Sequence, residues 1–349
     1  MQNAISLFTT ARMLALLMIS AMEGAAIAAA GPVRVEEIEY RGWKRNVQVS
    51  NGDVEVIATL EVGPRIISYK LKGGRNVFKE YDDQVGHSGE SEWMIRGGHR
   101  LWTAPEDTTR TYALDNAPIT YQRLGSEDGE GVRLISPPDA RYGLRKEIDV
   151  IPGSVGSRVR LVHRITNIGA RATELAPWAL SVMAPGGREI IPLPPRLPHP
   201  GSPKNAASAA DFGPNQLWVL WPYTRLSDPR WRFGDTFVTL AQRPATEPTK
   251  LGLLHRPGKV GYLNGRTLFI KSFGYRAGRR YPDGGVNYET FTNGDMLEME
   301  SLGPLQTLEP GRSVEHEETW ELHTVDPARI EADILPRLRA TPAEEPAPR

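Results

Sequence analysis

The chain has no cysteine among its 349 residues. Disulfides, thiol nucleophiles and thiolate metal sites are therefore excluded. It also lacks an excess of charge of either sign, since Lys plus Arg and Asp plus Glu both number 42. No long basic or acidic run occurs. Because nucleic-acid binding needs a concentrated positive face, we expect no nucleic-acid partner.

Long apolar runs are missing as well. The run at 13–22 is too short to span a bilayer, and no later segment is more apolar, so no membrane span is expected. This run follows Arg12 and precedes three alanines at 28–30, which is the order of a secretory signal peptide. We expect a mature protein that starts near Gly31 and is periplasmic or secreted. An uncleaved anchor or a misassigned start codon is the alternative.

Helical periodicity is scarce after the first thirty residues. Short segments of alternating apolar and polar residues are separated instead by Gly, Pro, Asn and Asp, namely 54–60, 66–71, 158–165, 237–240, 267–271 and 297–300. Only 327–338 has convincing helical spacing. The pattern predicts an all-β protein, a large antiparallel β-sandwich over 31–326, followed by a short C-terminal helix and a disordered tail in 327–349.

One internal stretch breaks the strand pattern. Residues 184–215 contain eight prolines and several glycines. A loop of that length inside a compact domain is usually functional or mobile. We expect a long surface excursion over one side of the sandwich.

Gly97 and Gly98 lie in the first segment that could form a binding or catalytic site. Paired glycines let a backbone turn sharply or approach a ligand closely. Arginine forks and tryptophan faces suit sugar hydroxyls and the apolar face of a pyranose. Such groups surround the pair: Arg96, His99, Arg100, Trp102 and Glu106. The plainer interpretation is a tight turn with structural ion pairs.

A second segment supplies carboxylates. Asn293-Gly294 is a hairpin signal, and the strand after it places Glu298 and Glu300 on one face. Two carboxylates so close perturb each other's pKa, and one of them is then suited to be a general base. Glu289 precedes the same hairpin. The alternative is a solvent-exposed polar face.

Several other residues favour structural roles. Trp178 lies among small apolar residues, which favours a core position over a sugar-stacking platform. His163 shares a strand face with apolar residues and is expected to be a core histidine. His316 and His323 lie among glutamates, where a metal site is conceivable but a solvated charged face is favoured. We expect no metal and no cofactor.

Taken in order, these motifs resemble the galactose mutarotase-like (aldose 1-epimerase-like) superfamily. The similar segments are Gly63-Pro64-Arg65-Ile66, Gly74-Arg75-Asn76-Val77-Phe78, Ile95-Arg96-Gly97-Gly98, Leu297-Glu298-Met299-Glu300-Ser301 and Leu308-Glu309-Pro310-Gly311. The resemblance implies that Glu300 is the catalytic base and that Arg96 binds substrate. The superfamily's acid is usually a histidine in one of two motifs, and neither histidine is present here. His99 is the remaining candidate for the acid.

Three functions are open at this point. The first is an exported carbohydrate-binding protein, and the second is an aldose 1-epimerase-like or other carbohydrate-active enzyme that uses Glu300 as base and His99 as acid. The third is a structural protein that has lost the sugar site. For the first two, we expect the site residues to converge on one cleft; they are His99 and Glu300 as catalytic residues, with Arg96, Arg100, Trp102, Glu106, Glu289 and Glu298 as substrate-binding residues.

Overall fold

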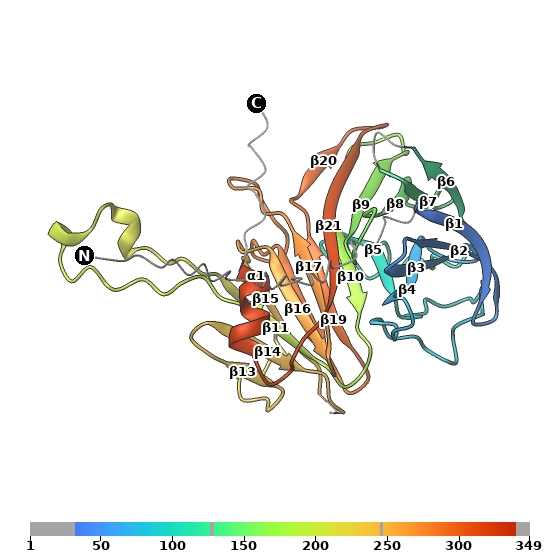
Figure 1. Cartoon of the computed structure of the whole chain (residues 1–349). Coiled ribbons are helices and arrows are strands. Elements are labelled where there is room, and N and C mark those ends of the chain that lie inside the picture. Colours follow the sequence, from blue (N-terminus) through green and yellow to red (C-terminus); the bar gives the residue numbers. More distant parts are fainter. Residues whose placement is uncertain (1–31, 126–128, 245–246, 340–349) are drawn as a thin grey trace, which may run out of the picture.

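Two large β-sheets pack face to face in the computed structural model, which describes residues 32–125, 129–244 and 247–339 (Figure 1). Every strand pairing in this part of the chain is antiparallel. The predicted all-β sandwich is therefore confirmed.

The first sheet has the strand order β1-β2-β3-β4-β5-β10-β19-β18-β15-β12, with β20 paired to β10. Its strands are β1 (Arg34–Tyr40), β2 (Trp43–Ser50), β3 (Val54–Thr59), β4 (Arg65–Leu71), β5 (His99–Ala104), β10 (Thr173–Val182), β12 (Trp218–Leu220), β15 (Thr249–Leu253), β18 (Tyr288–Thr292), β19 (Leu297–Leu302) and β20 (Gln306–Leu308).

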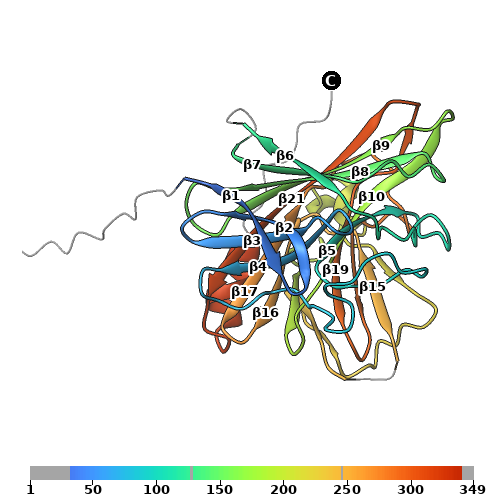
Figure 2. The same ribbon diagram turned by 90° about the vertical axis from the view of Figure 1, so that its right-hand side faces the viewer.

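The second sheet has the order β13-β14-β11-β16-β17-β21-β9-β8-β7-β6. Its strands are β6 (Thr120–Leu124), β7 (Gly131–Ile135), β8 (Leu144–Pro152), β9 (Val159–Asn167), β11 (Arg188–Pro192), β13 (Trp231–Phe233), β14 (Phe237–Ala241), β16 (Lys259–Asn264), β17 (Thr267–Phe273) and β21 (Ser313–Thr324). Figure 2 shows one end of the sandwich, where β1 and β2 lie against β7 and β8.

The main core lies between the two sheets. Leu297 and Met299 of β19 point into it, and they pack in one cluster with Trp320 and Phe269 of the second sheet. Because successive side chains of a strand point to opposite faces, Glu298 and Glu300 lie on the outer face of the first sheet. A separate apolar cluster that includes Trp102, Trp178 and Leu302 lies on that outer face.

The C-terminal helix expected from the sequence is present. It consists of a single π-helical turn, η3 (Ile330–Ile334), followed by α1 (Leu335–Arg339). Ile334, Leu335 and Leu338 are buried against Ile190 and other apolar residues of the second sheet's outer face. The helix therefore covers a face that would otherwise be exposed to water.

The expectation for the Pro-rich stretch is wrong in two respects. Residues 188–192 form strand β11 inside the second sheet, so the irregular segment begins only at Leu193. The segment also projects away from the sandwich as a long arm and does not lie over one side (Figure 1). Two short 3₁₀ helices, η1 (Pro203–Asn205) and η2 (Ala209–Phe212), lie along it.

The predicted signal peptide (1–30) and the tail from Thr341 lie outside the described residues. Among the helices that are described, none combines the length and apolar character needed to cross a membrane.

Candidate functional site

A row of polar side chains crosses the outer face of the first sheet. Arg65 of β4 is paired with Arg100 of β5, Arg100 with Leu180 of β10, Leu180 with Glu300 of β19, and Glu300 with Glu289 of β18. Directly paired residues of antiparallel strands point to the same face. All five are buried, although the face is not the one that packs on the second sheet.

The acidic end of the row is built around a lysine. Lys250 Nζ of β15 lies 2.7 Å from Glu289 Oε2 and 3.1 Å from Glu300 Oε2, and the Trp178 indole N–H donates to Glu300 Oε2 at 3.0 Å. Burial raises the pKa of Glu300 to about 7, against the opposing effect of Lys250. Burial also raises the pKa of Glu289 well above its usual range. At neutral pH this end therefore holds a charged lysine and a carboxyl pair that keeps a proton.

The basic end of the row contains two arginines and one carboxylate. Arg100 Nη2 donates to Glu298 Oε1 at 2.9 Å, and its guanidinium lies 4.0 Å from the Trp102 ring centroid. Arg65 donates to the carbonyls of Ile95 and Gly97 at 3.0 and 2.6 Å. Burial, with the charge of Arg100 next to it, lowers the pKa of Arg65 to about 9.

Aromatic side chains surround this charged row at its outer side. Trp93 and Tyr112 are half-buried and pack on Trp102, with ring centroids 5.3 and 5.1 Å away. At the acidic end, Trp221 is half-buried with its ring centroid 4.7 Å from Lys250 Nζ, and Tyr223 is 40% exposed. Rings that are partly open to water beside buried charges are the groups that sugar recognition uses.

Glu106 and Tyr223 are exposed polar side chains near this row. The exposed Glu106 accepts a hydrogen bond from the Tyr112 hydroxyl at 2.5 Å. Burial raises the pKa of Tyr223 to about 12, and the nearby carboxyls of Glu300, Glu106 and Glu289 add to the effect while Lys250 opposes it. The tyrosine hydroxyl therefore lies in the field of the carboxyls and stays protonated at neutral pH.

Solved structures with the same architecture are known. A TPR-domain containing protein from Parabacteroides distasonis aligns over 87% of this chain with a TM-score of 0.54 and 16% identity, and this chain spans only 50% of that protein. A galactose mutarotase-like protein from Clostridium acetobutylicum aligns over 84% of this chain and 99% of its own length, with a TM-score of 0.51 and 9% identity. The chain has the galactose mutarotase-like fold. No protein-family model and no curated protein sequence matches it.

Within this fold His99 does not lie where the sequence analysis expected it. His99 is paired with Ser181, and Ser181 with Met299, so its side chain points between the sheets. Glu300 points to the opposite face of the same sheet, and His99 is fully buried. The expectation that His99 and Glu300 meet in one cleft as acid and base is therefore wrong.

His99 is instead part of a hydrogen-bonded chain in the interior. His163 Nδ1 lies 3.0 Å from the His316 carbonyl oxygen and must carry a proton, which leaves His163 Nε2 as an acceptor for His99 Nε2 at 2.7 Å. His99 Nδ1 then accepts from the Ser181 hydroxyl at 2.8 Å. Burial lowers the pKa of both histidines, so the chain is neutral, and the expected core position of His163 is confirmed.

Glu318 lies beside these histidines, and His99, His163 and Glu318 together have the donor types of a metal site. Lys271 Nζ, however, lies 2.9 Å from Glu318 Oε1 and supplies the cation that this carboxylate needs. His316 and Glu318 are buried, so the favoured solvated face is wrong for these two residues. It holds for Glu315 and Glu317, which are exposed.

Arg96 and the two glycines shape the loop that leads into β5. Arg96 has a φ of +54°, and it donates to the Gln84 and His87 carbonyls and to the Glu90 carboxylate. Its guanidinium is thus bound to its own loop, in contrast to the substrate-binding role that the resemblance implies. A Cβ on Gly97 would lie 2.0 Å from the Lys79 carbonyl oxygen, so the close approach is to the protein's own backbone.

The structure thus brings together Arg100, Trp102, Glu289, Glu298 and Glu300 from the expected set, with Glu106 at the rim, and it separates His99 from them. The residues that sequence reasoning missed as site residues are Arg65, Trp93, Tyr112, Trp221, Tyr223 and Lys250. Trp178 has the buried position that the sequence favoured, and its indole also donates to Glu300. Lys250 had a signal, because it alternates with the buried Leu251 and Leu253 and so had to face outward.

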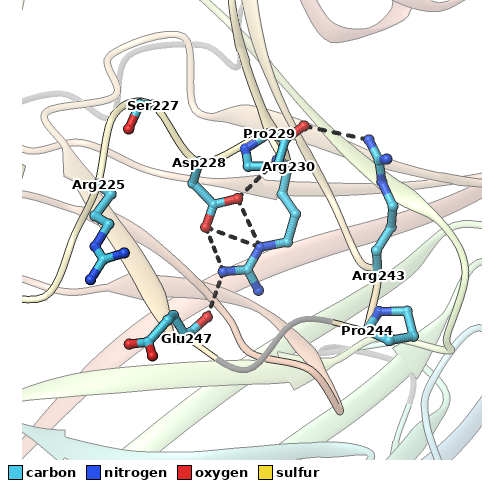
Figure 3. A pocket seen from close by; sticks show the side chains of 8 residues that line it. All are labelled: Arg225, Ser227, Asp228, Pro229, Arg230, Arg243, Pro244 and Glu247. Atoms are coloured by element: carbon cyan, nitrogen blue, oxygen red, sulfur yellow. Dashed lines mark hydrogen bonds and ion pairs between the residues drawn. The ribbon is translucent and has the colours of Figure 1, made fainter.

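A depression of about 340 Å³ lies elsewhere, lined by residues 225, 227–230, 243, 244 and 247 (Figure 3). The side chain of Arg230 is paired there with Asp228 and donates to the Glu247 carbonyl. Arg243 donates to the Pro229 carbonyl at 3.5 Å. Because no aromatic ring is among the described residues that line this depression, the charged row on the first sheet is the better candidate site.

Proposed function

We propose that this protein binds a saccharide on the outer face of its first sheet, over the row from Arg65 to Glu289. The observation that carries the proposal is the half-buried aromatic border above buried charges. Trp93 and Tyr112 lie at one end, and Trp221 and Tyr223 at the other. Aromatic faces pack on the C–H face of a sugar ring, and the charged groups bond its hydroxyls.

Calorimetric titration with a panel of neutral and acidic oligosaccharides tests this proposal. We expect binding that Trp93→Ala weakens by at least about tenfold, because the aromatic face is lost. Phe233→Ala is the matched control, since Phe233 is also a partly exposed aromatic but lies on β13 of the second sheet. The absence of binding across the panel would favour a structural protein that has lost the sugar site.

A second candidate is an aldose 1-epimerase-like isomerase with Glu300 as the base. The observation that favours it is the raised pKa of Glu300, about 7, beside Glu289, whose pKa is also raised by its burial. A base that titrates near neutral pH next to a protonated carboxyl is suited to moving a proton between two sugar oxygens. Glu289 takes the place of His99 as the candidate acid.

Polarimetry on freshly dissolved aldoses tests the second candidate. We expect Glu300→Gln to abolish any acceleration of mutarotation while saccharide binding persists, since the amide keeps the shape and removes the base. Binding without acceleration in the unmodified protein would leave saccharide recognition alone.

We further infer export to the periplasm or the medium. The support is the order of Arg12, the apolar run at 13–22 and the alanines at 28–30. N-terminal sequencing of protein from the native host should give a start near Gly31. An intact Met1 on soluble cytoplasmic protein would count against export.

A further inference from the structure

The basic end of the row contains buried hydrogen-bond donors that have no acceptor among the described residues. They are Arg65 Nε, Arg100 Nε and Nη1, Trp93 Nε1 and Trp102 Nε1. Buried polar groups in native proteins are nearly always paired, so a cluster of unpaired donors needs an explanation. All belong to residues in contact around Arg100, since its guanidinium lies 4.0 and 5.6 Å from the Trp102 and Trp93 ring centroids and Arg65 is its cross-strand neighbour.

The charges at this end do not balance either. Arg100 is paired with Glu298, and Arg65 makes no ion pair with any described residue. Asp115 is near enough to act on Arg65, but its carboxylate lies 3.0 Å from Lys146 Nζ and is already paired. Three cations and two carboxylates therefore lie at this end, which leaves one positive charge without a counter-charge. They are Arg65, Arg100, Lys146, Glu298 and Asp115.

From these donors and this charge we infer that the basic end is a subsite for the carboxylate of an acidic saccharide, with Arg65 and Arg100 as its binding residues. The inference rests on the proposed saccharide site and specifies its ligand as a hexuronic acid or its oligomer. A single negative charge matches the one uncompensated positive charge, whereas a phosphate ester carries nearly two at neutral pH. Two guanidinium groups also match the planar carboxylate in shape.

The position of this subsite also fits an acidic sugar. Leu180 separates Arg100 from Glu300 in the row, so the carboxylate subsite and the Lys250–Glu289–Glu300 group lie on neighbouring parts of one face. A sugar ring held by its carboxylate at Arg100 would place its hydroxyls toward these carboxyls. Trp93 and Tyr112, half-buried over Trp102, lie on the side from which the ligand would enter.

Matched pairs of methyl glycosides test the inference by calorimetry on the full chain. The two members of a pair differ only at C6, which is a carboxylate in the uronide and a hydroxymethyl group in the neutral sugar, in the gluco, galacto or manno series. The 6-phosphate of each neutral sugar is the third ligand compared. We expect the uronide of the preferred series to bind at least about tenfold more tightly than its neutral partner, as for a charge-assisted hydrogen bond. Arg100→Gln should reduce the ratio of uronide affinity to neutral-sugar affinity from at least about tenfold to within about threefold of one.

Arg65→Lys keeps the charge and removes the planar guanidinium, and it should lower the same affinity ratio, which covers the case in which Arg100→Gln does not fold. Arg145→Gln, on β8 of the second sheet, is the control. Equal affinity for uronide and neutral sugar, tighter binding of the 6-phosphate, or a uronide preference that survives both substitutions would each overturn the inference while saccharide binding stands. If no glycoside binds, the proposed function itself fails, and the inference fails with it.

Discussion

Individual residues show where sequence reasoning succeeded and where it stopped. Alternation along β19 correctly placed Glu298 and Glu300 on one face. The same rule, applied to His99 and Arg100, already required that only one of the two could face Glu300. The burial of Glu300 could not be predicted from the sequence, because it depends on Trp178 and Lys250, which come from other strands.

Burial of Glu300 makes the stability of the protein depend on pH. Its pKa in the folded protein, about 7, lies above the value of an unfolded chain, so its contribution is complete at low pH and is lost as pH rises toward 7. We expect the contribution of Glu300 to the free energy of unfolding, taken as the difference between the unmodified protein and Glu300→Gln, to fall by on the order of 3 kcal/mol between pH 4 and pH 8. Urea denaturation at several pH values should show a shallower fall in Glu300→Gln. Glu309→Gln, at an exposed turn, should keep the steep fall.

The buried histidine chain leads to a second prediction. His99→Ala leaves the Ser181 hydroxyl and His163 Nε2 without partners in the interior, so we expect a loss of about 2–4 kcal/mol in the free energy of unfolding. His163→Ala should cost a similar amount. Because the two rings bond each other, the double variant should lose about 1–2 kcal/mol less than the sum. Urea denaturation of the cycle measures this, and strictly additive losses would contradict the coupling. Saccharide binding should persist in both single variants.

At the scale of elements, the sequence predicted strands well, but it predicted their order only where a hairpin joins two neighbours. The segments at 66–71, 158–165 and 297–300 all coincide with strands of the structure, because alternation is a local property. The hairpin signal at Asn293-Gly294 indicates that β18 lies next to β19, but the place of β15 beside β18 is decided by long-range pairing. Lys250 was therefore missed: its outward orientation could be derived, but its position beside the Glu289–Glu300 hairpin could not.

Gly97 lies where the backbone before β5 comes close to the backbone at Lys79. Gly97 has a φ of +80°, and a Cβ there would also meet the Lys79 carbonyl oxygen at 2.0 Å. Gly73 has a φ of +72° with no atom within 4 Å of such a Cβ. We expect Gly73→Ala to cost about 1–2 kcal/mol from backbone strain alone, and Gly97→Ala to cost clearly more. Thermal unfolding of the two variants compares them, and equal losses would show that the close approach relaxes freely.

At the scale of the whole molecule, the sandwich was predictable because both its sheets bury one face and so impose alternation. The direction of the arm that begins at Leu193 was not predictable. Its residues from Pro195 to Leu217 are exposed or half-buried, so they carry no pattern that ties them to a surface. The helix at the C-terminus was predictable for the opposite reason, since its apolar stripe has to be covered.

This contrast predicts that the arm adds almost nothing to the stability of the sandwich. Replacing residues 195–215 with a short Gly-Ser linker keeps Leu193 and Trp218, which pack on the core, and removes only exposed or half-buried side chains. We expect the Tm to change by no more than about 3 °C, equivalent to about 1 kcal/mol. A chain that ends at Arg329 is the matched contrast, because it uncovers Ile190 and Leu268 and should lose several times that amount. Differential scanning calorimetry measures both variants. A large fall in Tm for the arm deletion would mean that the arm holds the sandwich together, and its exposed residues would then need another explanation.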